Sequence, residues 1–349
     1  MPAIAEEVVS PDEAAVVASF IKFIEETSAR RHPTGTIKRF NQGRAAGCVK
    51  AELTVLDTLA AEHRVGLFAG PRTYAAWIRF ANAGSKTDRE KDVRGMAIKV
   101  FEVPGANLTP GETSQDFVLN SHPVMVAPNT REFLQAMRAL EAGGFQQARY
   151  FLTHPRAALI GLRARQQPAC HLDIPYWSTT PYLFGPGRAV KYHVRPASGA
   201  VSSVPSNLTD TYLTDALKKR LSQEDAFFEL TVQFQTNPGT MPIEDASVEW
   251  SERESPYVPL ARIRIPKQAI DQADTVSRCE SIAFNPWHAL PAHRPLGNMN
   301  RARREIYQAM AAFRGRRPGA AAGTTTRCPE SACRQGLRGQ ASDTLKTDA

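Results

Sequence analysis

FNPWHALPAHRPLGN, residues 284–298, combines two histidines, one tryptophan, one arginine and three prolines in fifteen residues. The prolines fix φ and remove backbone donors, so this stretch fits neither a regular helix nor an inner strand. Bulky aromatic side chains gain no burial in a solvated surface loop. We interpret the stretch as a rigid connection that lines a pocket and directs side chains at a bound ligand. A packed crossover in which Trp287 fills a hole is the alternative.

Around this stretch the composition is that of a globular protein. The 349 residues are 42% hydrophobic and 22% charged, which suffices for a sizeable core in one or two domains. No run of about 18 apolar residues occurs, so we expect no transmembrane helix. The N-terminus is acidic and lacks the pattern of a secretory signal. Five scattered cysteines without a paired spacing indicate reduced thiols and a cytoplasmic protein, not a disulfide framework.

Charge and motifs exclude several classes of function. The net charge is +8, and many arginines lie after residue 300. No helix-turn-helix, zinc-finger or aromatic RNA-binding signature accompanies them, so a solvated helix face is favoured over nucleic-acid binding. Anionic groups of a cofactor are a third interpretation. The chain has no glycine-rich phosphate-binding motif, no G-x-S-x-G and no H-E-x-x-H, which argues against nucleotide-binding and hydrolase functions.

Apolar periodicity predicts an α+β fold. Alternation predicts strands over 49–56, 74–82, 95–103, 116–126, 189–196, 228–236 and 261–266. Helices are expected from a Ser10–Glu13 capping box to about Thr27, over 130–142 with a stop at Gly143–Gly144, over 154–166, and from about Arg301. Because strands and helices do not alternate regularly, we expect an antiparallel β-barrel with inserted and C-terminal helices. The expected divisions are a helical arm (1–30), a main domain (31–315) and a disordered tail (316–349).

Five motifs occur in the order found in one protein family. They are Tyr74–Phe80 (YAAWIRF), Asp92–Val100 (DVRGMAIKV), Gln115–Val124 (QDFVLNSHPV), Glu249–Ile265 with its W-x(4–6)-P spacing, and His293–Gly297 (HRPLG). Over about residues 36–312 the chain resembles the haem catalases, and more closely their small bacterial relatives that lack extra domains. The resemblance implies the catalase-like barrel and a b-type haem as cofactor.

A haem site needs an axial ligand, an apolar sandwich, cations for the propionates, and polar distal groups. By position, the resemblance implies Arg79 and Arg94 as the cations near the haem, with Trp287 and Arg294 as further cofactor contacts.

The distal positions depart from the family. Catalases place a histidine just before the first barrel strand, and counting back from Gly47–Leu53 puts Gln42 there, next to Asn41. The family's distal asparagine aligns with Ser121, and Asn120 precedes it. A glutamine cannot serve as general base near neutral pH. These replacements therefore predict a poor true catalase.

The proximal position departs as well. The family carries a tyrosine, with an arginine four residues earlier, shortly before H-R-x-L-G, but no tyrosine stands there in this chain. An ungapped count puts His288 at that position, and a neutral imidazole is a good iron ligand. The alternative is Tyr307, which follows Arg303 at the same R-x-x-x-Y spacing but after the motif.

The resulting expectation is a haem-dependent oxidoreductase related to peroxidases and catalases. It would act on an organic hydroperoxide or another small substrate by peroxidation or by rearrangement of an O–O or N–O bond. Gln42, Asn41, Asn120 and Ser121 would orient this substrate. The alternative is a non-catalytic haem- or ligand-binding protein on the same fold. Neither a nucleic acid nor a membrane span is expected, and the oligomeric state stays open, with a homodimer as one option.

Overall fold

The computed structural model describes residues 2–198 and 202–315. In this part of the chain, strands and helices come in the predicted mixed order. The strands are β1 (Arg44–Val55), β2 (Thr73–Asn82), β3 (Arg94–Val100), β4 (Gln115–Asn120), β5 (Tyr176–Trp177), β6 (Tyr182–Leu183), β7 (Ala189–Pro196), β8 (Ala226–Phe234) and β9 (Val258–Ile265). The helices are α1 (Glu13–Arg31), α2 (Thr130–Ala142), α3 (Gly144–Thr153), α4 (Pro155–Ala164), α5 (Tyr212–Gln223), α6 (Ala273–Ser281) and α7 (Asn298–Gly315).

The sheet closes into an antiparallel barrel. Its strand order is β5-β4-β3-β2-β1-β9-β8-β7-β6, and an additional pairing of β5 with β7 joins the two ends. In the described residues eight strands therefore form the barrel, and the short β6 pairs with β7 next to the β5–β7 pairing. The predicted α+β barrel is confirmed, and closure leaves no long open edge.

The barrel interior is filled by alternate residues, as period-two strands require. Val49, Leu53, Ile78, Phe80 and Ile98 are all less than 1% exposed and belong to one continuous core cluster. The strands of this region were predictable because the same alternation is visible in the sequence.

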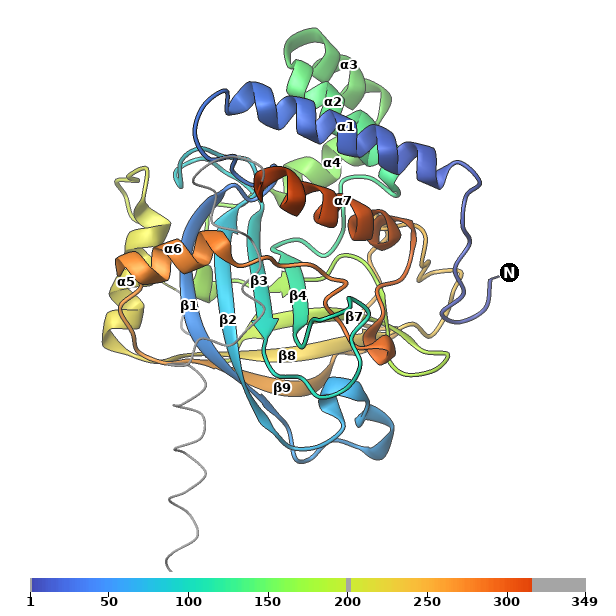
Figure 1. Ribbon diagram of the computed structural model, residues 1–349, viewed down its shortest axis with the longest axis vertical. Coiled ribbons are helices and arrows are strands. Elements are labelled where there is room, and N and C mark those ends of the chain that lie inside the picture. Colours follow the sequence, from blue (N-terminus) through green and yellow to red (C-terminus); the bar gives the residue numbers. More distant parts are fainter. Residues whose placement is uncertain (1, 199–201, 316–349) are drawn as a thin grey trace, which may run out of the picture.

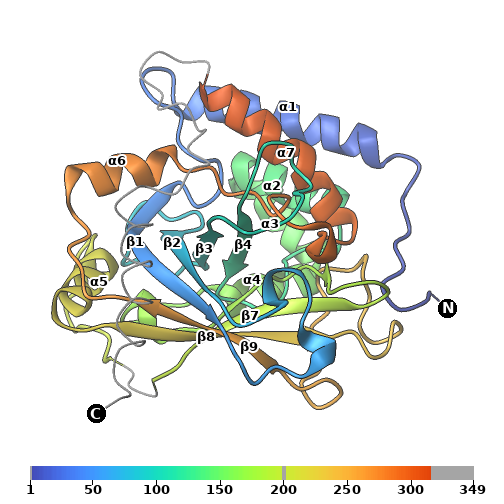
Figure 2. The ribbon, with the colours of Figure 1, turned by 60° about the horizontal axis from the view of Figure 1, so that its bottom comes forward.

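The outer face of β2–β4 is largely covered too, by helices. Figures 1 and 2 show α7 lying across the ends of β3 and β4, with α1 alongside it. Phe20 of α1, Leu134 of α2 and Ile306 of α7 pack into a second apolar cluster there. All seven residues of β3 are consequently buried. Outward-facing polar side chains of β2–β4 thus lie between two layers, where a ligand site can form.

Several helix predictions need correction. The Ser10–Glu13 capping box is wrong: α1 begins at Glu13 after Asp12, whose side chain makes no capping hydrogen bond. The Gly143–Gly144 stop ends α2, yet the chain turns there with positive φ at both glycines and starts α3 at once. Helices α3, α5 and α6 were not predicted, whereas α4 matches the helix expected over 154–166.

The expectation of reduced cysteines is also wrong for one pair. Cys48 of β1 and Cys279 of α6 form a disulfide across a separation of 231 residues. Cys170 is a buried free thiol. Cys328 and Cys333, like the predicted disordered tail after residue 315, lie outside the described residues. Of the helices in the described ranges, none is at once long enough and apolar enough to cross a membrane.

Candidate functional site

An amide pair lies on the outer face of the barrel where β3 and β4 meet the segment before β1. The Nε2 of Gln42 donates to the Oδ1 of Asn120 at 2.9 Å. Gln42 adopts a left-handed backbone conformation with φ of 55°, which is uncommon outside glycine. Its amide lies directly on Gly95, because a Cβ built there would come within 2.1 Å of the Gln42 Oε1. Gly95 therefore provides the space for this pair, a role that the sequence analysis missed.

Both amides are partly exposed, as is Val118, two residues before Asn120 on the same face of β4. Their mutual bond uses one donor and one acceptor. Among the described residues, the Oε1 of Gln42 and the Nδ2 of Asn120 have no further hydrogen-bond partner. The pair can thus offer the Oε1 of Gln42 as an acceptor atom and the Nδ2 of Asn120 as a donor atom, and neither group changes charge in the neutral pH range.

Arg79 lies beside this pair, buried, next to two partly buried arginines, Arg39 and Arg314. Its guanidinium donates to the backbone carbonyl of Gln42 at 2.8 Å, and its Nε is buried without a partner among the described residues. Burial and the neighbouring Arg39 lower the pKa of Arg79 to about 9, and burial also lowers that of Arg314 on α7 to about 10. Glu280 is the carboxylate nearest to Arg79, at 4.0 Å. Three arginines facing one glutamate leave an excess of positive charge that suits an anionic ligand.

A guanidinium–phenol pair lies on α7. The Nη2 of Arg303 donates to the hydroxyl of Tyr307 at 3.0 Å, and its Nη1 donates to Asn300 at 3.1 Å. Burial lowers the pKa of Arg303, but the oxygens of Tyr307 and Tyr182 outweigh this and raise it. The charged guanidinium donates to the phenol oxygen, and a tyrosine oxygen is a known type of iron ligand. Tyr307 and Phe40, which is two residues before Gln42, pack against one apolar cluster. Arg314 of α7 also lies close enough to Arg79, the partner of the Gln42 carbonyl, to lower its pKa, so α7 lies near the segment that carries Gln42.

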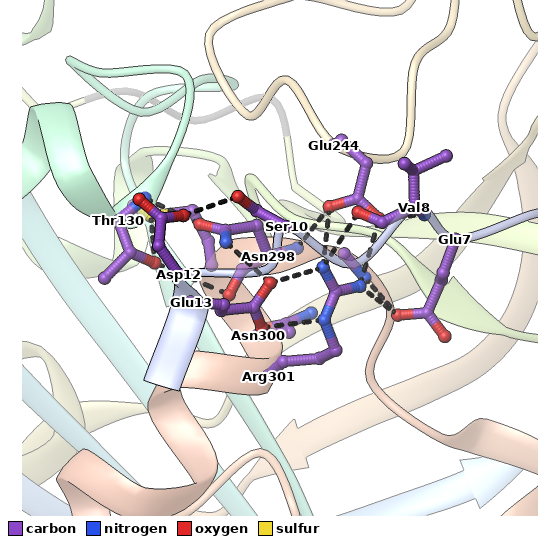
Figure 3. A network of polar contacts seen from close by, with 12 residues as sticks. Glu7, Val8, Ser10, Asp12, Glu13, Thr130, Glu244, Asn298, Asn300 and Arg301 are labelled. Atoms are coloured by element: carbon purple, nitrogen blue, oxygen red, sulfur yellow. Dashed lines mark hydrogen bonds and ion pairs between the residues drawn. The ribbon is translucent and has the colours of Figure 1, made fainter. Parts of the chain in front are cut away.

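A polar network fixes the start of α7, as Figure 3 shows. Arg301 forms ion pairs with Glu7, Glu13 and Glu244 at 2.7, 2.8 and 3.0 Å. Although burial would raise the pKa of Glu7, hydrogen bonds from Gly297, Arg294 and Arg301 lower it. Arg301 is only two residues before Arg303, so this network determines where the Arg303–Tyr307 pair points.

His288, the first candidate for the axial ligand, lies in a different environment. Its Nδ1 is 3.0 Å from Asp116 and 3.2 Å from the Nζ of Lys99, and its Nε2 is 3.6 Å from Glu112. Lys99 and Asp116 are 1% and 0% exposed. Both ring nitrogens therefore face charged protein groups. This arrangement favours the alternative, Tyr307, although the ligand role of either residue remains a prediction.

Other predicted site residues have partners that serve the fold. Arg94 is fully buried and donates to Asn82 and to the carbonyl of Glu90, at 2.5 and 2.8 Å. Its register partner Asn82 shares the inner face of the barrel with Phe80, so Arg94 lies on the opposite face of the sheet from Arg79. The hydroxyl of Ser121 accepts from the backbone N–H of Arg94 at 2.9 Å.

The remaining predicted residues lie around the amide pair and α7. Asn41 is exposed. Arg294 donates to Glu7 of the N-terminal arm at 2.6 Å. Trp287 is 6% exposed, and its indole donates to the carbonyl of Asn300 at 2.7 Å. For Trp287 the alternative interpretation, a packed crossover, describes the structure better than a pocket wall.

A hollow of about 700 Å³ opens next to β5 and β7, where Trp177 is the register partner of Asn120. Trp177, His193, Trp250 and Tyr257 contribute to its lining. Within the described residues, none of the predicted site residues lines this hollow, so volume alone does not locate the candidate site.

The residues around β2–β4 and α7 fit a haem by their chemistry. Tyr307, hydrogen-bonded to Arg303, would supply an oxygen ligand. Arg79 supplies a buried cation with a donor left over, as a propionate requires. Gln42 and Asn120 supply the polar groups for a small ligand. Arg39, Arg303 and Arg314 were not among the predicted site residues. Only Arg303 had a sequence signal, its spacing to Tyr307.

Comparisons with known proteins agree with this architecture. No family model matches the chain, and no curated protein matches its sequence. Among solved structures, a fungal catalase matches with a TM-score of 0.64 and 15% identity over 86% of this chain. A bacterial catalase matches with a TM-score of 0.66 and 15% identity over 94%. This chain covers 64% and 66% of theirs, less than two thirds of each. The barrel, its strand order and these likenesses together show that the chain has a catalase-like fold.

Proposed function

We propose that this protein is a haem-dependent oxidoreductase that acts on an organic hydroperoxide or a related small molecule with a weak O–O or N–O bond. The observation that carries the proposal is the Arg303–Tyr307 hydrogen bond, on a helix next to the Gln42–Asn120 pair. When bound, a haem would supply the iron centre that cleaves such a bond. Tyr307 would hold it from α7, and Arg79 would pair with a propionate.

The amide pair supports a substrate other than hydrogen peroxide. Disproportionation requires a proton to move between the two peroxide oxygens, which a histidine can relay and an amide cannot. Gln42 and Asn120 instead orient a bound molecule through one free acceptor and one free donor. This chemistry suits a substrate whose own structure determines how its bond rearranges after cleavage.

The first experiment is the absorption spectrum of protein purified from cells supplied with iron and a haem precursor. We expect a Soret band and one haem per chain by the pyridine-haemochrome assay. Tyr307→Phe should shift the spectrum or abolish haem retention, whereas His288→Asn should leave the band position unchanged. Tyr150→Phe, on α3, is the matched control for loss of a phenol. If folded protein does not take up haem at all, the proposal is wrong.

The second experiment concerns the amide pair. Gln42→His places a titratable base at the distal position, and we expect hydrogen peroxide turnover to rise in the haem-loaded variant. Asn41→His, one residue earlier and exposed, is the matched control and should have no effect. Equal turnover in the Gln42→His and Asn41→His variants at full haem loading would favour the binding-protein alternative.

A further inference from the structure

Three helices, α2, α3 and α4, form a projection that follows directly on β4. In Figure 1, α3 lies at the end of the molecule furthest from β8 and β9. The base of the projection is anchored, because Gln166 pairs with Asp92 and Arg165 donates to the carbonyl of Lys91. The outer parts of α3 and α4 therefore present a surface that the rest of the fold does not cover.

This surface has an unusual distribution of apolar side chains. Phe145, Leu152 and Leu162 are 77%, 83% and 73% exposed. On the inner side, by contrast, α3 buries only Tyr150, and α4 buries two alanines. An amphipathic helix of a globular protein normally places its large apolar residues inward. On α3 and α4 most of the large ones point outward, and the protein's own core does not explain them.

The exposed faces also carry positive charge without compensation. Residues 142–172 contain four arginines and no aspartate or glutamate. Arg149 lies between Phe145 and Leu152 on the exposed face of α3, and Arg163 is one turn after Leu159 on that of α4, by helical periodicity and exposure. Helices that lie in the interface of a membrane typically combine leucine and phenylalanine with arginine in this way.

We propose that the exposed faces of α3 and α4 bind an anionic lipid surface, with Phe145, Leu152 and Leu162 entering the headgroup–acyl boundary. Self-association of this surface is disfavoured, because a two-fold interface would bring the same arginines together with no acidic partners in the segment. The projection also lies near the candidate site. Besides burial, Arg163 lowers the pKa of His122, which is two residues beyond Asn120. A lipid surface bound there would lie close to the Gln42–Asn120 pair.

The test is co-sedimentation of the full chain with vesicles, and it requires no haem, so it is independent of the proposed function. We expect binding to vesicles of phosphatidylglycerol and phosphatidylcholine in equal parts, and much weaker binding to phosphatidylcholine alone. The variant with Leu152→Ser and Leu162→Ser should lose roughly tenfold or more in affinity. The variant with Arg149→Gln and Arg163→Gln should lose roughly fivefold per arginine, on anionic vesicles only.

Val9→Ser is the matched control, because Val9 is 62% exposed on the N-terminal arm, and its binding should equal that of the wild type. All changed side chains are exposed, so the melting temperatures of the variants should agree with that of the wild type. Absence of wild-type binding to any vesicle would refute the proposal. So would a dimer, detected by sedimentation velocity, that the leucine variant converts to monomer, since the surface would then bind a second copy.

Discussion

The buried cluster around Asp116 yields the sharpest prediction about stability. The Nζ of Lys99 donates to both carboxylate oxygens of Asp116 at 2.8 Å. The backbone N–H of Asn285 donates to the same carboxylate at 2.9 Å, and the Nδ1 of His288 lies 3.0 Å from it. The backbone N–H of Asp116 in turn donates to the carbonyl of His288. Asp116→Asn keeps the volume of the side chain and removes its charge.

The expected cost follows from what the substitution leaves behind. Lys99 is 1% exposed, so its ammonium would remain buried after losing its nearest counter-charge. Breaking a buried ion pair on one side costs about 3–5 kcal/mol. We therefore expect the free energy of unfolding to fall by about this amount in urea denaturation, as a lower midpoint with an unchanged m-value. Adding Lys99→Met removes the stranded charge, so the double variant should be more stable than Asp116→Asn alone.

The pH dependence gives an independent check. Burial would raise the pKa of Asp116, but Lys99 and His288 lower it below the ordinary 3.8. A lowered carboxylate pKa stabilises the fold above pH 3.8, and this contribution is lost as the pH falls through the lower, folded-state pKa. Asp116→Asn should remove this acid-dependent loss. A cost below about 1 kcal/mol, the size of an ordinary surface effect, would refute the description of the cluster as a buried ion pair.

Three further predictions concern stability. Reducing the Cys48–Cys279 disulfide should lower the free energy of unfolding by about 5 kcal/mol, because the bond closes a long loop in the unfolded chain. The measurement is urea denaturation with and without reductant, and an unchanged midpoint of urea denaturation would contradict the presence of the disulfide. Burial lowers the pKa of Lys191 from 10.5 to about 7. Between these two pH values the unfolded chain binds the proton that the folded protein has lost, so the free energy of unfolding of the wild type should rise with pH by up to about 5 kcal/mol. Lys191→Met should abolish this rise in the free energy of unfolding. Arg301→Met, which removes the cation shared by three carboxylates, should cost about 3 kcal/mol. Arg304→Met removes an exposed guanidinium that lies over the Trp287 ring and should cost about 1 kcal/mol or less. Equal melting temperatures of these two variants would argue against the network.

The barrel could be predicted from the sequence because its core follows a local rule. Val49, Leu53 and Ile78 occupy alternate positions whose apolar character is visible without any tertiary information. Helix α5 carried an equally clear signal, because Leu213, Leu217 and Leu221 recur at helical spacing and are all buried, and this signal was overlooked. Strands β5 and β6 have only two residues each, which is too short for any period to show.

The site was less predictable because its contacts are long-range. Gln42 and Asn120 are 78 residues apart, and only the alignment with a known family suggested that they meet. His288 illustrates the limit more strongly. Its position relative to a motif suggested an iron ligand, but its surroundings come from Asp116 and Lys99, 172 and 189 residues earlier. A count along one segment cannot contain that information.

Hydrogen-bond saturation separates the polar residues that hold the fold together from those that can bind a ligand. Buried polar groups normally find protein partners, so a group whose partners are complete has little left to offer. Trp287 and Lys99 are of this kind, although both lie in or next to family motifs. The Nε of Arg94 is also buried without a partner among the described residues, but its side chain lies on the opposite face of the sheet from the amide pair. Gln42, Asn120 and Arg79 each keep a donor or acceptor that the described part of the protein does not fill. A buried guanidinium nitrogen without a partner costs free energy unless something else occupies it. The fold tolerates this cost at Arg79, next to the amide pair, and a bound anion at that position would remove it.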